Sequence, residues 1–171
     1  MSTEKTAAPE SAAVRNHPVQ QQRGWAMLLV LLGAATTTAS YFLPLVRVGI
    51  RDGKDFTLWS MADYGSPGVS AAFGLALAAI VVPIWALSLG SGRGIATAMV
   101  FLAAAEVLTT VVVTLVGVYM LPGVTAFQDG SLRLSFYPAL GLLIASLSMT
   151  ATAAIWWCLV EWTTGSTPGR G

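Results

Sequence analysis

The stretch that decides the fold is IATAMVFLAAAEVLTTVVVTLVGVYML, residues 95–121, which contains a single charged residue, Glu106. About 20 predominantly apolar residues are enough for a helix to cross the hydrocarbon core of a bilayer. Three further stretches qualify and contain no charge at all: 24–43, 67–89 and 135–160. Because backbone groups in lipid must satisfy their own hydrogen bonds, each stretch is expected to be a helix. The predicted fold class is therefore an all-α membrane protein, a bundle of four transmembrane helices.

The composition leads to the same class. Of the 171 residues, 55% are hydrophobic and only 10% are charged, and the mean hydropathy is +0.70. A soluble domain carries about 25% charged residues, so an ordinary water-soluble fold is excluded. The net charge of +1 gives no basic surplus for a nucleic-acid partner. A single cysteine, Cys158, excludes an internal disulfide and a multi-cysteine metal site.

The polar ends of the chain frame the membrane domain. Residues 1–23 and 163–171 are predicted to be disordered tails, and residues 24–162 to form the membrane domain. An even number of spans places both tails on one side of the membrane. Arg23 directly precedes the first span and Arg93 lies between the second and third, so the positive-inside rule favours cytoplasmic termini. The predicted location is the cell (plasma) membrane, in a multi-pass arrangement.

The loop 44–66 between the first two spans is expected to be structured. Two β-prone runs, 45–50 and 56–61, flank Asp52-Gly53, which is typical of a short extracytoplasmic β-hairpin. Alternation places Leu45 or Val46, and Phe56 or Leu58, toward the membrane, with Arg47 and Thr57 toward water. The alternative is an irregular loop, because an isolated hairpin is only marginally stable. The candidate recognition residues of this outer loop are Arg47, Arg51, Asp52, Lys54 and Trp59.

The same loop resembles the claudin-type layout, which also has four spans and a long first outer loop with strands. The resemblance is carried by Pro44, Arg47, Val48, Leu58 and Trp59. It implies a small β element that caps a left-handed four-helix bundle. The chain departs from the family pattern at Val46, where the family has tryptophan, and at Thr57, where it has glycine, and both loop cysteines of the family are absent. A junction-forming role therefore does not carry over.

Small residues at four-residue spacing are the candidates for helix packing, because helices in lipid associate where small side chains allow close approach. The second span carries Ser70, Gly74 and Ala78 at this spacing, and the fourth span carries Gly141 and Ala145. Both rows are predicted to face the interior of the bundle.

Glu106 is the one acidic or basic residue within the four spans, 11 residues into the third, so it lies about 16 Å along that helix. Matching depths across the spans predicts a buried polar seam around it, made of Thr110, Thr114, Thr37, Ser148 and Thr152. Three interpretations stay open. Burial favours a protonated acid that donates to a hydroxyl; alternatively, Glu106 pairs with a group on a partner subunit; alternatively, it relays protons or holds a cation.

The chain contains no pattern typical of catalysis. Its one histidine, His17, lies in the predicted tail, and no second membrane acid or Cys-His cluster accompanies Glu106. We therefore expect no catalytic residues, no metal and no cofactor. The favoured function is a non-enzymatic accessory or scaffold subunit of a larger membrane complex, of respiratory or export type, with membrane lipid and other integral membrane subunits or further copies of itself as partners. The alternatives are a small oligomeric transporter or proton-conducting protein that uses Glu106, and a membrane enzyme or immunity protein.

Overall fold

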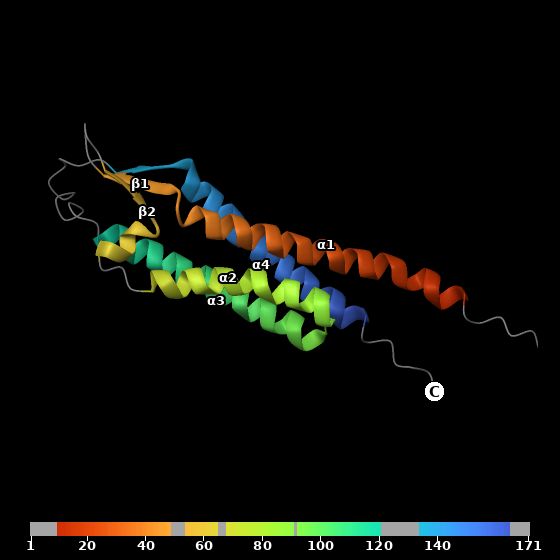
Figure 1. The fold of residues 1–171 in the computed structure, drawn as a ribbon. Helices are drawn as coiled ribbons and strands as arrows, with labels where there is room; N and C mark the ends of the chain where they lie inside the picture. Colours follow the sequence, from red (N-terminus) through yellow and green to blue (C-terminus); the bar gives the residue numbers. More distant parts are fainter. Residues whose placement is uncertain (1–9, 49–53, 65–67, 91, 121–133, 165–171) are drawn as a thin grey trace, which may run out of the picture.

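The computed structural model describes residues 10–48, 54–64, 68–90, 92–120 and 134–164 (Figure 1). Four long helices run along one axis, and three short strands gather at one end, which we call the sheet end. The opposite end, where α1 begins and α4 ends, is called the terminal end. In chain order the elements are α1 (Glu10–Ser40), β1 (Pro44–Val48), β2 (Lys54–Thr57), the 3-10 helix η1 (Ser60–Tyr64), α2 (Val69–Leu89), α3 (Arg93–Met120), β3 (Leu134–Phe136) and α4 (Pro138–Thr164).

Three of the helices, α2, α3 and α4, are long and apolar enough to cross a membrane. They correspond to the predicted spans 67–89, 95–121 and 135–160. The helix α1, which contains the predicted span 24–43, is not among them. Its apolar part is shorter, because polar residues precede Gly24 and three consecutive threonines, Thr36 to Thr38, approach its end.

The ends of the helices differ from the predicted limits. α1 begins at Glu10, so residues 10–23 are helical rather than disordered; alanine, glutamine and glutamate in this stretch favour a helix even without apolar periodicity. α4 begins at Pro138, because the predicted first residues of this span belong to strand β3. Proline suits the first turn of a helix, where its missing N–H is not needed. At its other end α4 continues through Thr164, into the predicted tail.

The predicted hairpin is present and is extended by a third strand. β1 pairs antiparallel with β2 on one side and with β3 on the other. Leu45 and Val46 are both buried, because the register shifts between Pro44 and Val46 and such an irregularity turns consecutive side chains to one face. Phe56 and Leu58 are also buried, while Arg47 is exposed. Arg47 is thus exposed as predicted, whereas Thr57, which was also predicted to point toward water, is half-buried.

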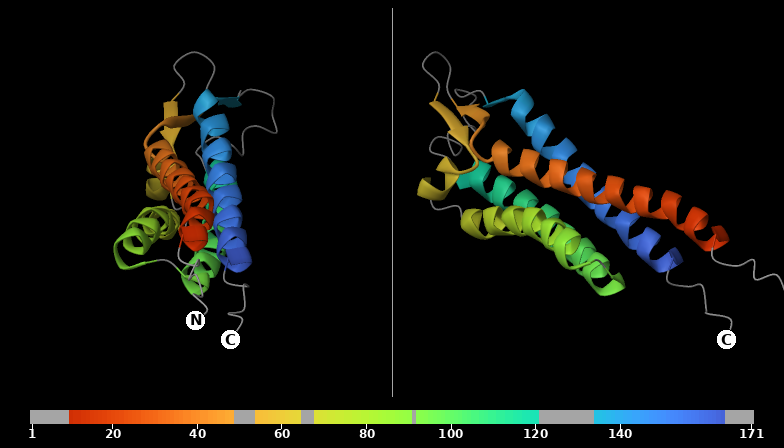
Figure 2. Two further views of the ribbon diagram at one scale, coloured as in Figure 1. Left: turned by 90° about the vertical axis from the view of Figure 1, so that its right-hand side faces the viewer. Right: turned by 45° about the vertical axis from the view of Figure 1, so that its right-hand side comes forward.

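The helices form two antiparallel pairs, α1 beside α4 and α2 beside α3 (Figure 2). α1 and α4 approach each other closely at Gly33: a Cβ atom placed there would lie 3.0 Å from the backbone nitrogen of Thr150 and 3.1 Å from the carbonyl oxygen of Ser146. α2 turns a row of small residues inward, with Ala72, Ala76 and Ala79 fully buried. Small residues therefore do bring the helices together, as expected for packing in lipid.

The rows predicted from sequence are not the ones that pack. Ser70, Gly74, Gly141 and Ala145 are all exposed, and Ala78 is half-buried. A Cβ atom placed on Gly74 or on Gly141 would meet no other atom within 4 Å. The four-residue spacing was a correct sign of a small-residue face, but the face points outward. A period alone does not say toward which side of a helix the neighbouring helix lies.

Candidate functional site

Glu106 lies midway along α3 and is completely buried. Both of its carboxylate oxygens are buried, and neither has a hydrogen-bond partner within the described part of the chain. Native proteins rarely leave a buried polar atom without a partner, and such an atom calls for an explanation. An ionised carboxylate in this position would lack any compensating charge.

Hydroxyl groups gather between Glu106 and the sheet end. Thr110, one turn further along α3, is buried, and its Oγ1 lies 3.1 Å from the hydroxyl oxygen of Tyr41. Tyr41, just beyond α1, is thus held against the turn of α3 that follows Glu106. Thr37 of α1 donates to the Ser146 Oγ of α4 at 2.9 Å. We call these two pairs of buried hydroxyls the polar seam; Thr37 and Thr110 are among the residues predicted for it.

The other predicted members of the seam lie elsewhere. Thr114 is half-buried and donates to the Thr110 carbonyl of its own helix at 2.7 Å. Ser148 and Thr152 of α4 are exposed, and Ser148 donates to its own helix, to the Ile144 carbonyl at 2.8 Å. The buried hydroxyls of α4 are those of Ser146 and Thr150. Matching depths predicted the correct level of α4, but two residues along a helix turn a side chain to a different face.

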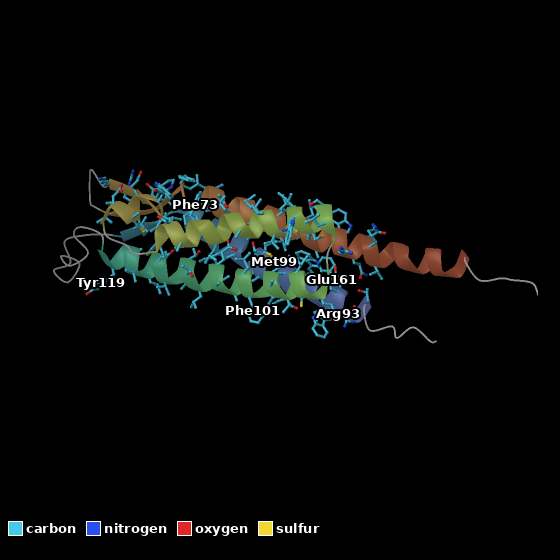
Figure 3. All side chains as sticks on the ribbon, turned by 60° about the horizontal axis from the view of Figure 1, so that its bottom comes forward. Phe73, Arg93, Met99, Phe101, Tyr119 and Glu161 are labelled. Carbon is cyan, nitrogen blue, oxygen red and sulfur yellow. The ribbon has the colours of Figure 1, made fainter. Side chains whose placement is uncertain are left out.

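Toward the terminal end, the surroundings of Glu106 are apolar. The buried hydrophobic residues there form one cluster, which includes Met27, Val30, Met99, Ala103 and Trp157. Farther along α4 than Ser146, the polar residues Thr150 and Glu161 are also buried. Figure 3 shows Met99 within the bundle and Phe101 pointing outward. Among the described residues, the Thr110 and Tyr41 hydroxyls therefore lie on the sheet side of Glu106, and the hydrophobic cluster lies on its terminal side.

A cleft of about 170 Å³ opens between α3 and α4 beside this seam. Its walls include Thr110 and Thr114 of α3 together with Leu140 and Leu143 of α4. Its rim is apolar and exposed, with Leu115 and Ile144 both more than half accessible. The cleft therefore reaches Thr110, one helical turn from Glu106, from the apolar outer surface of the bundle.

A second polar cluster, which was not predicted, ties the helices together at the terminal end. Arg23 of α1 forms an ion pair with Glu161 of α4 at 3.1 Å, and the Trp157 indole donates to the same carboxylate at 3.3 Å. Arg93 of α3 donates to the Glu161 carbonyl at 3.4 Å and lies 5.1 Å from the ring centroid of Trp162. Figure 3 shows Arg93 and Glu161 at this end. In the sequence, the only indication of this cluster was that Glu161 follows the apolar span directly and lies four residues after Trp157, on the same side of the helix.

The sheet carries a third polar group on its exposed face. Arg47 and Asp55 lie opposite each other in β1 and β2 and form an ion pair at 2.8 Å. The Tyr137 hydroxyl also donates to Asp55, at 2.8 Å. The hydrogen bond from Arg47, followed by that from Tyr137, lowers the pKa of Asp55 below its ordinary value. Arg47 is thus engaged within the chain rather than directed outward for recognition.

Of the remaining candidates for recognition, the structure describes Lys54 and Trp59. Lys54 is exposed, with its ammonium 5.6 Å from the Phe56 ring centroid. Trp59 is 43% exposed and packs edge-on against Phe73, with ring centroids 5.2 Å apart. Arg51 and Asp52 lie outside the described residues.

No family model, curated protein or solved structure matches the chain. Within the described ranges, no three His, Cys, Asp or Glu residues come together in a group suited to a metal ion.

Proposed function

We propose that this chain is a non-enzymatic integral membrane protein that serves as an accessory or scaffold subunit of a larger membrane complex. Its part in the complex is to offer a helix face to a membrane-spanning helix of another protein. The single observation that carries the proposal is the outward-facing row of small residues on α4, described below.

The proposal includes α1 as a fourth span. α1 lies along α4 through the full bundle, as Figure 2 shows. The helical residues from Gly24 to Ser40 extend over about 25 Å, close to the thickness of the hydrocarbon core. On the side of α1 away from α4, Leu28 and Leu32 are about half exposed. Large apolar side chains on this surface are accounted for by contact with acyl chains.

The row on α4 consists of Gly141, Ala145, Ser148 and Thr152, which follow one another at helical spacing and are all exposed. A groove of about 300 Å³ runs beside its second half, lined by Ser148 and Thr152 of α4 and Leu29 of α1, among others. A face turned to lipid alone has no need of small residues. A face that receives another helix does, because small side chains let two backbones approach closely.

The occupant we propose is a single transmembrane helix of a different protein, itself carrying small residues at the contact. The Ser148 and Thr152 hydroxyls suit such an occupant, since hydroxyl side chains form hydrogen bonds between helices in lipid. Both termini would lie on the cytoplasmic side, and the sheet on the outer side.

The test is recovery of the complex from native membranes in mild detergent, with identification of bound proteins by mass spectrometry. The chain is compared with two variants that add equal bulk, Ala145→Leu in the row and Ala104→Leu on the exposed face of α3. We expect a defined integral membrane protein to be recovered with the unchanged chain and with Ala104→Leu, and to be lost with Ala145→Leu. Recovery of a lone homo-oligomer, or equal recovery with both variants, would contradict the proposal.

The buried carboxylate of Glu106 favours a second candidate, a proton-conducting protein. Conduction needs polar contacts on both sides of the carboxylate, and on its terminal side lies a hydrophobic cluster that includes Met99 and Ala103. A flux assay on the purified protein in liposomes separates the two candidates, because an accessory subunit alone conducts no protons.

A further inference from the structure

We propose that Glu106 is a proton-binding site with access from one side only: it holds one proton in the closed bundle and exchanges that proton toward the sheet end, through the hydroxyls of Thr110 and Tyr41. The proposal does not depend on the accessory role above. It would hold for the isolated protein in lipid, with no partner present.

The first step is the state of the carboxylate. Glu106 is completely buried, and its two oxygens have no hydrogen-bond partner in the described part of the chain. An ionised group without a counter-charge is strongly disfavoured in such surroundings. A protonated acid carries no net charge, so it removes most of this penalty without any change in the packing of the helices.

The second step is the absence of a competing charge nearby. α2, which packs on α3, contains no ionisable residue. Tyr41, just beyond the end of α1, contacts Thr110, one turn of α3 from Glu106. The other ionisable groups lie toward the two ends of the bundle, as far as the side chains on and around α3 are described. Arg23, Arg93, Cys158 and Glu161 are at the terminal end, and Asp63 and Tyr119 are at the sheet end. None of the described ones pairs with Glu106.

The third step is the direction of exchange. Thr110 lies one turn from Glu106 on the same face of α3, where side chains four apart are neighbours. Its hydroxyl meets that of Tyr41 at 3.1 Å, and Thr110 also lines the cleft between α3 and α4. On the other side of Glu106 lies a hydrophobic cluster that includes Met99 and Ala103, and the buried Thr150 hydroxyl of α4 is taken up by its own helix, donating to the Ser146 carbonyl at 3.0 Å. A proton released by Glu106 therefore passes along the Thr110 and Tyr41 hydroxyls, each of which accepts one proton and donates one, to water at the sheet end, and leaves a carboxylate behind.

The test uses N,N′-dicyclohexylcarbodiimide, an apolar reagent, on the full chain in lipid nanodiscs. A protonated carboxyl adds across one C=N bond of the reagent: its oxygen bonds to the central carbon and its proton passes to nitrogen. The product rearranges to a stable N-acylurea, which mass spectrometry locates on a peptide. The cleft of about 170 Å³ beside Thr110 gives the reagent an approach from the lipid.

We expect the adduct on Glu106, formed more slowly as the pH rises, because only the protonated carboxyl adds to the reagent. Glu161 is the matched comparison within the same molecule, because Arg23 and Trp157 occupy its carboxylate; we expect no adduct there. The absence of an adduct on Glu106, an equal adduct on Glu161, or a rate that does not change with pH would each overturn the proposal.

Two further measurements test the one-sided access. The first follows the infrared carbonyl band of the protonated acid, which shifts as its proton exchanges in heavy water and which Glu106→Gln identifies by its absence. Tyr41→Phe is expected to slow this exchange about tenfold, the factor of one lost hydrogen bond. Thr97→Val, at the terminal end and half-buried, is the control and should leave the rate unchanged. Proton flux through liposomes above that of Glu106→Gln would show access from both sides and would refute the proposal.

Discussion

Replacing Gly33 by alanine is expected to force α1 and α4 apart where Gly33 lies against Ser146 and Thr150. The added Cβ atom would lie 3.0 Å from the Thr150 nitrogen and 3.1 Å from the Ser146 carbonyl oxygen, and would overlap the Thr150 Oγ1. Two of these three atoms belong to backbone, so a side-chain rotation cannot relieve the contact. Overpacking of this kind costs about 1–3 kcal/mol, while glycine to alanine within a helix gains up to about 1 kcal/mol. The expected net loss is about 1–2 kcal/mol.

The assay is reversible unfolding of the purified protein in mixed detergent micelles, followed by helical circular dichroism. Gly74→Ala and Gly141→Ala are the matched controls, because both positions are helical and a Cβ atom at either meets nothing within 4 Å. These variants should be as stable as the unchanged chain or slightly more stable. Addition of Thr150→Ala to Gly33→Ala should recover part of the loss, since it removes the overlapping hydroxyl but leaves the backbone contacts. If Gly33→Ala were as stable as the two controls, the close approach of α1 and α4 would be wrong.

Three other substitutions test the polar contacts. Hydrogen bonds lower the pKa of Asp55. The ionised carboxylate therefore stabilises the fold above the ordinary aspartate pKa, and this stabilisation is lost as the pH falls through the lowered pKa. Amide hydrogen exchange of β1 should become faster over this pH range in the unchanged chain but not in Asp55→Asn. Arg23→Ala removes the ion-pair partner of the buried Glu161 carboxylate. It should lower the stability of the folded protein by about 1–3 kcal/mol, more than Glu161→Gln does, in the same unfolding assay. Thr37→Val removes the hydroxyl pair with Ser146 and should cost about 0.6 kcal/mol, with no further loss on adding Ser146→Ala in a double-mutant cycle.

The sequence predicted those features that depend on composition and local pattern. The helices α2, α3 and α4 follow from long apolar stretches, and the pairing of β1 with β2 follows from two β-prone runs around Asp52-Gly53. The burial of Glu106 and Thr110 also followed, because a charge inside a span must turn away from lipid. Each of these conclusions needs only one segment of the chain.

The predictions that were wrong required knowledge of two segments at once. Ser148 and Thr152 are at the predicted depth but on the outer face of α4, because the rotation of a helix about its axis is set by its neighbour. The third strand, β3, joins β1 from a distant part of the chain, and its three residues were too few to stand out. The ion pair of Arg23 and Glu161 joins two helix ends that only the folded bundle brings together.

The pairing of α1 with α4 also has a consequence for synthesis of the protein. The ribosome makes α1 first and α4, its main neighbour, last. The strands follow the same order: β1 is made early, and its partner β3 only just before α4. While translation proceeds through α2 and α3, the Gly33 face of α1 has no α4 to cover it. The nascent chain therefore completes its bundle only after α4 has been inserted, and premature termination anywhere before that point leaves the first helix without its main contact.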